Sequence, residues 1–532
     1  GIKELSKLQA VINICNDKYH TDITFQNIVQ SGLDDPKVYQ LLQKGYTQNI
    51  FQFSSKGMTK FLVSMQPDKI EDLIAANALF RPATLDSGST DKYVDCKLGD
   101  ADPVYLWGTY NAMKNTYGVL CYQEQLAQIA REVGKFSLGE GVKLVKLISK
   151  KKVDKILALR DKFMAGANEN GCPKEDAEAI WHMFEVAGGY LFNKSHATAY
   201  AVTAYAGAYL KANYPTAFYT IALQWAKDDE IPTLMSEMEL CSEAKIVPPD
   251  INVSGGTFIT DYETNEIFWS LSRIKMLGAK ATEWIINERN VRGEFSSIEN
   301  FIERIFRYKL KLYKYWDDPD NPNEATKCPV NARHVRHLIL SGCFDKVENA
   351  QSVIERYAIL EKAAKCLGFE ISEKDIPEDL RNKHYFWSQQ QIAISGIGAI
   401  DYKRIYDNSE AKPKIKGKAS WALLKNIQDP DYDGKRVAIC ANIVDIEEKK
   451  FKDKKTGENR VFCKLLLQQN NDLVEMVIWN DEWMNVRATL CKGGSLSSAK
   501  NKMLICSAQV KYSDYTGGNN LQLYKSSIID IL

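Results

Sequence analysis

The amino-acid sequence predicts an α+β protein of several domains, with a mainly helical first half, a mixed middle region and a β-rich end. Its 532 residues exceed the length of one ordinary domain. Apolar residues recur with helical spacing up to about residue 245, and alternation of apolar and polar residues begins near Asp429. We therefore expect domains at 1–245, 246–428 and 429–532.

The composition excludes several classes of protein. Hydrophobic residues make up 45% and charged residues 26% of the chain, which is typical of soluble globular proteins. The net charge is only +1, so any surface that binds nucleic acid must be local. The twelve cysteines form no C-x-x-C pair, which favours reduced, mostly buried thiols. Without a long apolar run or a signal peptide, the expected location is the cytoplasm, with no membrane partner.

The first region reads as a series of helices with recognisable ends. The segment DDPKVYQLLQKG opens with acidic residues and Pro and closes at Gly45, and YQEQLAQIAREVG ends at Gly134. A long helix rich in small residues, ATAYAVTAYAGAYLKANYP, is expected to break at Pro215. Strands and helices do not alternate here, so no Rossmann-like sheet is expected.

The middle region contains one hairpin and two helical units. FITDYETNEIFWSLSRI alternates like a β-hairpin with Thr264 and Asn265 in the turn. IKMLGAKATEWIINERN reads as two helical pieces joined at Gly278, and VNARHVRHLILSGCFDKV as a helix that Gly342 ends. Residues 308–328 read as an inserted loop with solvated charges.

The last region suits a small all-β barrel of the oligonucleotide-binding (OB) type, because about five strands fit into roughly 100 residues. Two of them flank a turn at Asn470 and Asn471. Such a barrel binds single strands through exposed aromatic rings beside Lys or Arg. Some of the candidates are expected to belong to the core instead. They are Phe451, Phe462, Trp479, Tyr512, Tyr515 and Tyr524, with Lys449, Lys452, Lys454 and Arg460.

Signatures of catalysis are missing from the sequence. It has no phosphate-binding glycine loop, no G-x-S-x-G elbow and no zinc spacing of His and Cys. His334 and His337 share a helix face, but without a third ligand they read as surface or capping residues. The acidic doublets at 34–35, 228–229 and 317–318 lie beside turns and read as caps and loops. No metal site is therefore predicted.

Two basic elements are candidates for phosphate contact. Arg81 precedes Pro82 in LFRPATLDSG, and a lysine cluster follows in LGEGVKLVKLISKKK. These lysines suit a triphosphate or a nucleic-acid backbone as point charges. The alternative is a solvated helix end, where the helix dipole favours Lys. In a helix the first two share one face; the cluster is Lys143, Lys146, Lys150, Lys151 and Lys152.

A third candidate is the polar run in GGYLFNKSHATAYA. Asn193, Lys194, Ser195 and His196 precede or open an apolar helix, and Asn193 or Ser195 is a suitable N-cap. One interpretation is a capping motif with a satisfied His. The other is a helix start that binds an anionic ligand or the edge of a sugar.

Eight segments follow one another along the chain: QNIFQFSSKGMTKFL, DLIAANALFRPATLDSG, GVLCYQEQLAQIA, SLGEGVKLVKLISKKK, GGYLFNKSHATAYAVTAYAGAYLKANYP, VPPDINVSGGTF, LSRIKMLGAKATEWIINERN and VNARHVRHLILSGCFD. In order and wording they closely resemble the C-family replicative DNA polymerases, the alpha subunits of bacterial DNA polymerase III. The resemblance is strong from residue 1 to about 400 and looser over the β-rich end.

The resemblance implies an architecture. Residues 1–245 would be the edge of the palm and the fingers, and 246–428 a little-finger or clamp-binding-like domain with helix-hairpin-helix elements around 275–281. Residues 429–532 would be the OB barrel. In the middle domain Lys275, Gly278 and Lys280 would then contact DNA.

The resemblance also implies roles in the fingers. Arg81 and Lys146 would contact phosphates of the incoming nucleotide. His196, with Ser195, would face the nucleotide sugar and help to reject ribose, while Lys194 would face a phosphate or the template strand. Tyr200 would pack near the base pair, whereas Tyr205 is expected in the core.

The sequence departs from the family pattern at four points. Val145-Lys146 stands where the family has paired arginines, and Lys does not replace a bidentate Arg fully. Ala83 stands where Arg-Pro-Gly is usual, and no Q-x-x-[LM]-F clamp peptide is visible. The opening GIKELSKL resembles the segment just after the last metal-binding aspartate of the palm. The resemblance therefore places the catalytic carboxylates outside this sequence.

Three hypotheses follow. In the first, the chain is the carboxy-terminal half of such a polymerase and binds dNTP and primer-template DNA. A palm- and thumb-bearing chain or segment would then hold the Mg²⁺ ions, and a sliding clamp is a further partner. The richness in Lys, Asn and Tyr favours a phage-encoded split version. In the second, the chain is a non-catalytic DNA-binding replication factor. In the third, it is an excerpt of a longer protein.

Overall fold

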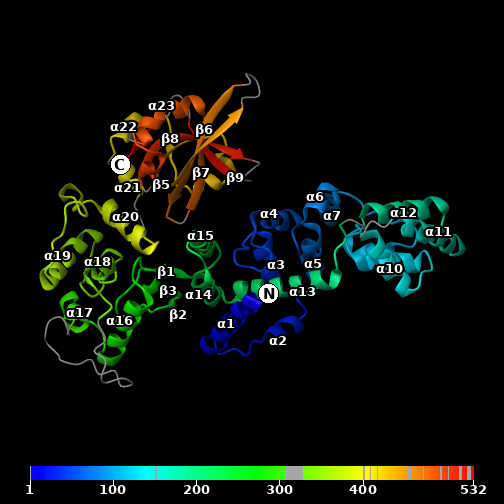
Figure 1. Ribbon diagram of the computed structural model, residues 1–532, viewed down its shortest axis with the longest axis horizontal. Coiled ribbons are helices and arrows are strands. Elements are labelled where there is room, and N and C mark those ends of the chain that lie inside the picture. Colours follow the sequence, from blue (N-terminus) through cyan, green and yellow to red (C-terminus); the bar gives the residue numbers. More distant parts are fainter. Residues whose placement is uncertain are drawn as a thin grey trace. The chain divides into compact units, whose positions relative to one another are not determined.

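The computed structural model describes residues 2–149, 153–187, 190–306, 328–398, 402–407, 409–415, 417–452, 458–470, 472–491, 494–500, 502–513, 518–523 and 529–531 (Figure 1). Helices dominate the chain up to residue 415 and a large sheet follows, which confirms the α+β multidomain class. The chain divides into two compact units, Gly1–Trp225 with Glu237–Ala244, and Ala226–Ser236 with Lys245–Leu532. The predicted inserted loop lies, except for Cys328, outside the described residues.

The described part of the first unit is helical. Its helices are α1 Ile2–Lys18, α2 Phe25–Gln30, α3 Pro36–Gln43, α4 Lys56–Met65, α5 Ile70–Leu79, α6 Pro82–Asp86, α7 Ser89–Leu98, α8 Tyr110–Met113, α9 Gln123–Glu132, α10 Leu138–Ser149, α11 Val153–Glu169, α12 Lys174–Ala187, α13 Lys194–Asn213 and α14 Pro215–Trp225, with the 3₁₀ turn η1 Lys114–Thr116. Side chains of Thr24, Asp35 and Ser55 accept hydrogen bonds from backbone N–H groups at helix starts. These caps satisfy donors that a helix start leaves free.

The long helix α13 organises the first unit (Figure 1). It packs against α1, α2, α3, α5 and α14. Buried alanines, among them Ala197, Ala201 and Ala204, let those helices approach closely. Pro215 begins α14 directly after α13 ends, so the predicted break is confirmed. Tyr205 is fully buried in this packing, as expected.

A second core of the first unit lies among α9 to α12. Phe163, Trp181 and Phe184 form its aromatic centre, with ring centroids 5.5–6.0 Å apart. A Cβ at Gly166 would lie 2.1 Å from the carbonyl oxygen of Gly134, so glycine allows α11 to touch the end of α9. α10 packs against both of these helices.

The second unit begins with a small sheet of order β1-β3-β2. Its strands are β1 Lys245–Val247, β2 Ile259–Asp261 and β3 Glu266–Phe268. β2 and β3 pair antiparallel, and Asn265 before β3 has φ 59°. The predicted hairpin with Asn265 in its turn is therefore confirmed.

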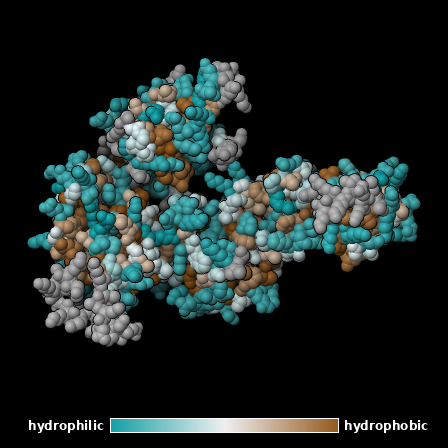
Figure 2. All heavy atoms as spheres, viewed as in Figure 1, coloured by the Kyte–Doolittle hydropathy of each residue, from teal (hydrophilic) through white to brown (hydrophobic). Residues whose placement is uncertain are grey.

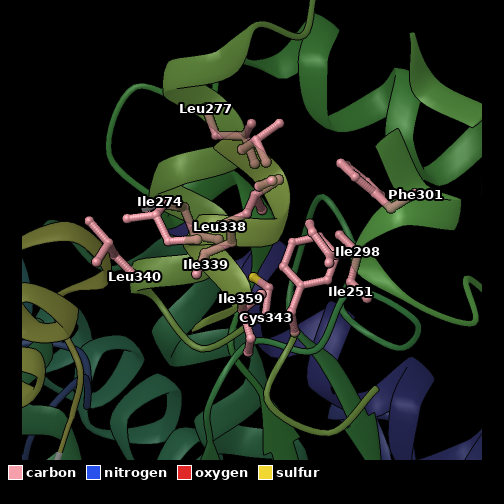
Figure 3. Packing of buried hydrophobic residues seen from close by; sticks show 14 of the residues in the cluster. Ile251, Ile274, Leu277, Ile298, Phe301, Leu338, Ile339, Leu340, Cys343 and Ile359 are labelled. Atoms are coloured by element: carbon pink, nitrogen blue, oxygen red, sulfur yellow. The ribbon is translucent and has the colours of Figure 1, made fainter. Parts of the chain in front are cut away.

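Helices pack around one apolar core after this sheet. Figure 3 shows Phe301, Leu338 and Ile359 among the side chains that meet there. The helices are α15 Ile231–Cys241, which has residues in both units, α16 Ala279–Arg292, α17 Ile298–Ile305, α18 Ala332–Leu340, α19 Arg356–Leu367, α20 His384–Ser395, α21 Tyr402–Asp407 and α22 Ala411–Ile415, with 3₁₀ turns η2 Leu271–Arg273, η3 Val353–Glu355 and η4 Glu378–Leu380. Gly342 follows α18 with φ 93°, as expected for a helix end. Of the two helical pieces predicted to join at Gly278, only the second is a helix, α16. Residues 274–277, predicted as the first piece, form a bend and turn directly after η2.

The carboxy-terminal sheet has seven strands in the order β10-β8-β9-β7-β6-β5-β4, and β8 also pairs with β5. Its strands are β4 Ser420–Trp421, β5 Arg436–Lys452, β6 Asn459–Gln469, β7 Asp472–Ile478, β8 Met503–Ser513, β9 Gly518–Gln522 and β10 Ile529–Ile531, with 3₁₀ turns η5 Asn426–Gln428, η6 Pro430–Tyr432 and η7 Leu496–Ala499 nearby. The β8–β5 pairing partly closes the sheet, as expected of a barrel. Sequence reasoning missed helix α23, Asn480–Cys491, whose Trp483, Leu490 and Cys491 join the core of the sheet.

The surface is of ordinary character. On the face in Figure 2 hydrophilic side chains predominate, with hydrophobic ones between them. All twelve cysteines are free and nine of them are buried, which agrees with the predicted thiols. No helix among the described residues is both long and apolar enough to cross a membrane.

Candidate nucleic-acid interface

The start of α13 is a network of polar side chains. Asn193 is the N-cap, because its Oδ1 accepts hydrogen bonds from the backbone N–H of His196 (2.9 Å) and from the Ser195 hydroxyl (2.6 Å). Glu124, in the first turn of α9, accepts from the backbone N–H of Lys194 (2.9 Å) and from the Asn193 amide (3.1 Å). The Glu124 carboxylate thus already occupies part of this helix start. A ligand would meet the exposed side chains of Ser195 and His196.

Three aromatic side chains follow one another at intervals of four residues where α13 begins; we call Phe192, His196 and Tyr200 the ring row. Phe192 lies just before the N-cap, and His196 and Tyr200 lie on α13 itself. The centroids of Phe192 and His196 lie 5.6 Å apart, and those of His196 and Tyr200 lie 4.1 Å apart. Phe51 continues the row, with its centroid 5.0 Å from that of Tyr200 at an interplanar angle of 67°. Sequence reasoning missed Phe192, which the spacing of four could have found, and Phe51, which no local pattern indicates.

Arg81 closes the other end of the ring row. Its guanidinium lies 4.4 Å from the Phe192 ring centroid, donates from Nε to the carbonyl of Ala78 (3.0 Å) and from Nη2 to the carbonyl of Tyr190. Partial burial lowers the pKa of Arg81 from its usual value. The two carbonyls and the Phe192 ring hold the guanidinium in place before any ligand binds. Its contact with a phosphate stays a prediction.

The predicted lysines of α10 stand on an exposed surface. Among the described residues, neither Lys143 nor Lys146 forms an ion pair, and both are exposed. Glu140 in the same helix instead binds Lys162 of α11 and accepts from the backbone N–H of Ser137 (3.0 Å), and these contacts lower the pKa of Glu140 to about 2. Val145 is buried beside Lys146. Lys150, Lys151 and Lys152 lie outside the described residues.

Lys194 does not stand alone at the helix start. Its ammonium lies 5.5 Å from the centroid of the Tyr122 ring. Such a cation–π contact orients the charge without neutralising it. Lys194 therefore keeps a charge available beside Ser195 and His196.

In the second unit Lys275, Gly278 and Lys280 are exposed and adjoin the start of α16. Gly278 is its N-cap, with no side-chain cap bond and open space around the position of a Cβ. His337 of α18 lies with Nδ1 2.6 Å from the Lys275 carbonyl oxygen, which joins the two helical units. His334 accepts from the backbone N–H of Asn331 (3.3 Å), so the capping interpretation is confirmed for His334.

The carboxy-terminal sheet gathers three of the predicted aromatic side chains. Phe451, Phe462 and Trp479, here called the aromatic face, have ring centroids 5.3–5.8 Å apart. Lys449 is paired with Phe462 and Arg460 with Phe451 across β5 and β6, so these residues share a face of the sheet. Trp479 is exposed and the two Phe rings are half-buried. None of the three belongs to the buried core.

Each cation that the structure describes on this face has an acidic neighbour. Lys449 lies 3.0 Å from Glu447, Arg460 lies 3.6 Å from Glu458, and Lys464, which sequence reasoning missed, lies 3.2 Å from Glu475. Tyr512 is exposed, but on β8 opposite Asn519 of β9. The side chain of Lys452 and all of Lys454, Tyr515 and Tyr524 lie outside the described part.

No group of three or more His, Cys, Asp or Glu that could hold a metal ion occurs within the residues that the structure describes. Two of the acidic doublets have a residue with another partner: Asp35 caps α3, and Asp228 forms an ion pair of 2.7 Å with Arg273. The third, at 317–318, lies outside the described residues. The described residues therefore do not fit a pair of Mg²⁺ ions, which needs converging carboxylates.

Comparison with known proteins agrees with this geometry. Residues 4–171 match the bacterial DNA polymerase III alpha subunit finger domain, and residues 243–314 match the helix-hairpin-helix motif. The DNA polymerase III subunit alpha of Aquifex aeolicus is 34% identical over 366 residues, 68% of this chain and 29% of the relative. That of Escherichia coli K12 is 28% identical over 528 residues, 95% of this chain and 42% of the relative.

The subunit alpha of Thermus aquaticus is 34% identical over 317 residues, 57% of this chain and 25% of that relative. The chain thus spans less than half the length of these curated relatives. It belongs to the family of bacterial DNA polymerase III alpha subunits, with that family's finger domain and a helix-hairpin-helix motif.

Proposed function

We propose that this chain forms the fingers, helix-hairpin-helix and OB parts of a C-family DNA polymerase and binds the incoming dNTP and primer-template DNA during replication. One observation carries the proposal: the exposed side chains of Ser195 and His196 and the ring row lie together at the start of α13, in a unit whose residues 4–171 match the polymerase finger domain. This surface offers hydrogen bonds to a sugar and rings to a base.

The division of labour follows from the chemistry of each side chain. Ser195 and His196 face the sugar, where a hydroxyl and an imidazole distinguish the presence of a 2′-OH. Tyr200 packs on the base or the nascent pair, since aromatic rings stack on any base. Arg81, Lys143 and Lys146 attract the triphosphate as fixed or mobile cations. Their work is to select and orient the nucleotide.

The helix-hairpin-helix region supports contact with the DNA backbone. The start of α16 has no side-chain cap at Gly278, so its first backbone N–H groups suit a ligand oxygen, with Lys275 and Lys280 beside them. Helix starts and lysines bind phosphate oxygens without reading sequence. This region would therefore hold the duplex in place.

The carboxy-terminal sheet supports a single-strand role. Its partly closed order and the aromatic face suit an OB-type surface on which bases stack. The palm, thumb and metal-binding carboxylates would come from another chain or another segment. There Mg²⁺ would supply Lewis-acid chemistry at the phosphates. A sliding clamp remains a further expected partner.

The test uses the complete chain reconstituted with a palm-bearing polymerase chain on primer-template DNA. We expect His196→Ala to reduce the preference for dNTP over rNTP by about 2- to 12-fold, the worth of roughly one net hydrogen bond. The measurement is the dissociation constant of each nucleotide. His182→Ala is the matched control, because His182 is an exposed histidine of the same unit, and it should leave the preference unchanged.

Two other outcomes would count against the proposal. Primer extension by the purified chain alone, with Mg²⁺ and dNTPs, would contradict the supply of carboxylates from elsewhere. Salt-dependent DNA binding with no nucleotide binding in the reconstituted complex would favour the alternative, a non-catalytic replication factor.

A further inference from the structure

The loop at 46–53, between α3 and α4, has a backbone shape that its own sequence does not favour. Asn49 and Gln52 have φ of 58° and 62°, in the left-handed region that side chains other than glycine rarely adopt. Within the loop, the side chains of Thr47, Ile50 and Phe53 are buried. Such a conformation persists only where the surroundings impose it. We call residues 46–53 the tethered loop.

Buried charged groups hold the tethered loop from beneath. Lys211 of α13 donates to the carbonyls of Tyr46 (3.0 Å) and Gln48 (2.8 Å) and forms an ion pair with Glu237. Glu237 accepts in turn from the backbone N–H of Gln48 (3.0 Å) and from the Tyr219 hydroxyl (2.9 Å). The ion pair is thus satisfied by hydrogen bonds, several of them to the loop backbone.

The anchor and the ring row lie on the same helix. About three turns of α13 separate Tyr200 from Lys211, which places both on the same side of the helix. The tethered loop is held at Lys211 by its backbone and reaches Tyr200 with Phe51. The buried ion pair therefore sets where the Phe51 ring stands.

We propose that Phe51 is a positioning residue, which holds the Tyr200 ring, and through it His196, in the orientation that the incoming nucleotide meets. The inference rests on the proposed function, because it takes Tyr200 and His196 to face the nucleotide. Phe51 meets Tyr200 near the perpendicular arrangement that aromatic pairs prefer. Tyr200 in turn lies against His196 at 4.1 Å.

A role of Phe51 in stability alone can be distinguished from the proposed positioning of Tyr200. Phe53 in the same loop is fully buried, whereas Phe51 and Tyr200 are both half-buried. Loss of a positioning contact leaves the unit folded but frees the Tyr200 ring. The effect then shows in the surroundings of His196 and in nucleotide affinity.

The experiment follows the imidazole signals of the complete chain by nuclear magnetic resonance with ¹³C-labelled histidine. The sequence has only six histidines, so His196 can be assigned with His196→Gln. Ring currents of Phe192 and Tyr200 should displace its signal, and Tyr200→Leu should reverse much of that displacement. We expect Phe51→Leu to move the same signal in the same direction and Phe51→Tyr to preserve it.

The second measurement is the dNTP dissociation constant in the reconstituted complex. Phe51→Leu should raise it by about 2- to 12-fold, the range that an aromatic pair contributes, and Phe51→Tyr should restore it. Tyr110→Leu is the matched control, since Tyr110 also forms an edge-to-face pair, with Tyr105, but stands apart from the ring row. The control should change neither measurement.

The outcomes separate the two proposals. An unchanged His196 signal in Phe51→Leu overturns the positioning role, and so does unchanged dNTP affinity in that variant while Tyr200→Leu binds more weakly. If both variants move the signal but neither changes dNTP affinity, the assignment of Tyr200 to the nucleotide has failed, and the positioning role falls with it.

Discussion

Two regions of the molecule present clustered aromatic rings beside cations, and they are built differently. The ring row of the first unit lies at the start of α13 and is supported, through Phe51, by the buried Lys211–Glu237 pair. The aromatic face of the carboxy-terminal sheet lies on strands β5 and β6 and just after β7, and its three rings support mainly each other. The position of the first set of rings is therefore set by buried residues, whereas the second set lies on the outside of the sheet.

The cations differ in the same way. In the first unit Arg81 is fixed by two carbonyls, and the acidic Glu140 is bound to Lys162 rather than to Lys143 or Lys146. On the aromatic face every described cation has its own glutamate within 3.6 Å. The first surface keeps its positive charge available, and the second masks it.

This contrast teaches what each surface suits. Fixed rings and available cations suit a ligand of defined shape and high charge, such as a nucleoside triphosphate. Cations that are already paired, beside rings that pack edge-to-face and tilted against each other, suit sequence-tolerant stacking of bases with a weak dependence on salt. Three changes test this difference: removal of the buried Lys211–Glu237 pair, removal of the glutamates beside Lys449 and Lys464, and removal of the partner of Glu140.

The largest effect is expected from breaking the buried pair. Lys211→Met leaves Glu237 buried without its cation and should lower the free energy of unfolding of the first unit by about 3–5 kcal/mol. It should also raise amide exchange in the tethered loop, because Lys211 holds the carbonyls of Tyr46 and Gln48. Hydrogen exchange of peptides from this unit at increasing urea measures both.

The control is the double variant Lys211→Met/Glu237→Leu. Replacing both partners removes the uncompensated charge and should restore part of the stability, although the Gln48 N–H and the Tyr219 hydroxyl lose their acceptor. A single variant within about 1 kcal/mol of the original protein, with unchanged amide exchange in the tethered loop, would show that the buried pair does not hold this loop.

The sequence predicted the features that local rules decide. Asn193 caps α13 and Asn265 turns the hairpin, because short-range sterics and hydrogen bonds select those residues. Helix α23 was missed because it lies between segments whose alternation of apolar and polar residues predicts strands. The exposure of Lys143 and Lys146 on α10 agrees with the sequence, because repeated charges along a helix favour a solvated face, whereas their contact with phosphate stays a prediction.

Contacts between distant segments were not predictable. Phe51 and Tyr200 meet only when α13 packs beside the tethered loop, and nothing near Phe51 indicates its partner. Lys211 reads as an ordinary helix-end lysine, yet it is fully buried by tertiary packing with Glu237. Masking on the sheet also depends on register, which brings Lys464 within reach of Glu475 across β6 and β7.

The second prediction removes the mask from the aromatic face. In Glu447→Gln/Glu475→Gln, Lys449 and Lys464 lose their acidic neighbours. Each lysine can then neutralise a phosphate of the DNA, which releases the counterion condensed there. The slope of log K against log salt for single-stranded DNA should steepen by about 0.7 for each cation released. Fluorescence titration at several salt concentrations measures the slope.

Two variants show whether binding occurs on this face. Trp479→Leu should weaken single-strand binding by about 1–3 kcal/mol, the range for one stacked base. Met484→Leu changes another exposed apolar side chain of the same region and should have no effect. An unchanged slope together with unchanged binding by Trp479→Leu would remove the aromatic face from the DNA-binding surface.

The smallest effect concerns Glu140, whose bond to Lys162 leaves Lys143 and Lys146 unmasked. These contacts lower its pKa from 4.5 to about 2. Because the pKa in the folded protein is depressed, the stabilising contribution is fully present above about pH 4.5 and is lost as the pH falls through about 2. The ¹³C carboxyl signal of Glu140 should therefore stay that of an ionised group between pH 5.5 and about 3.5. In Lys162→Gln it should titrate closer to 4.5, while a signal that moves equally in both proteins would mean that Glu140 is free to mask Lys143 and Lys146, as the glutamates of the aromatic face mask their neighbours.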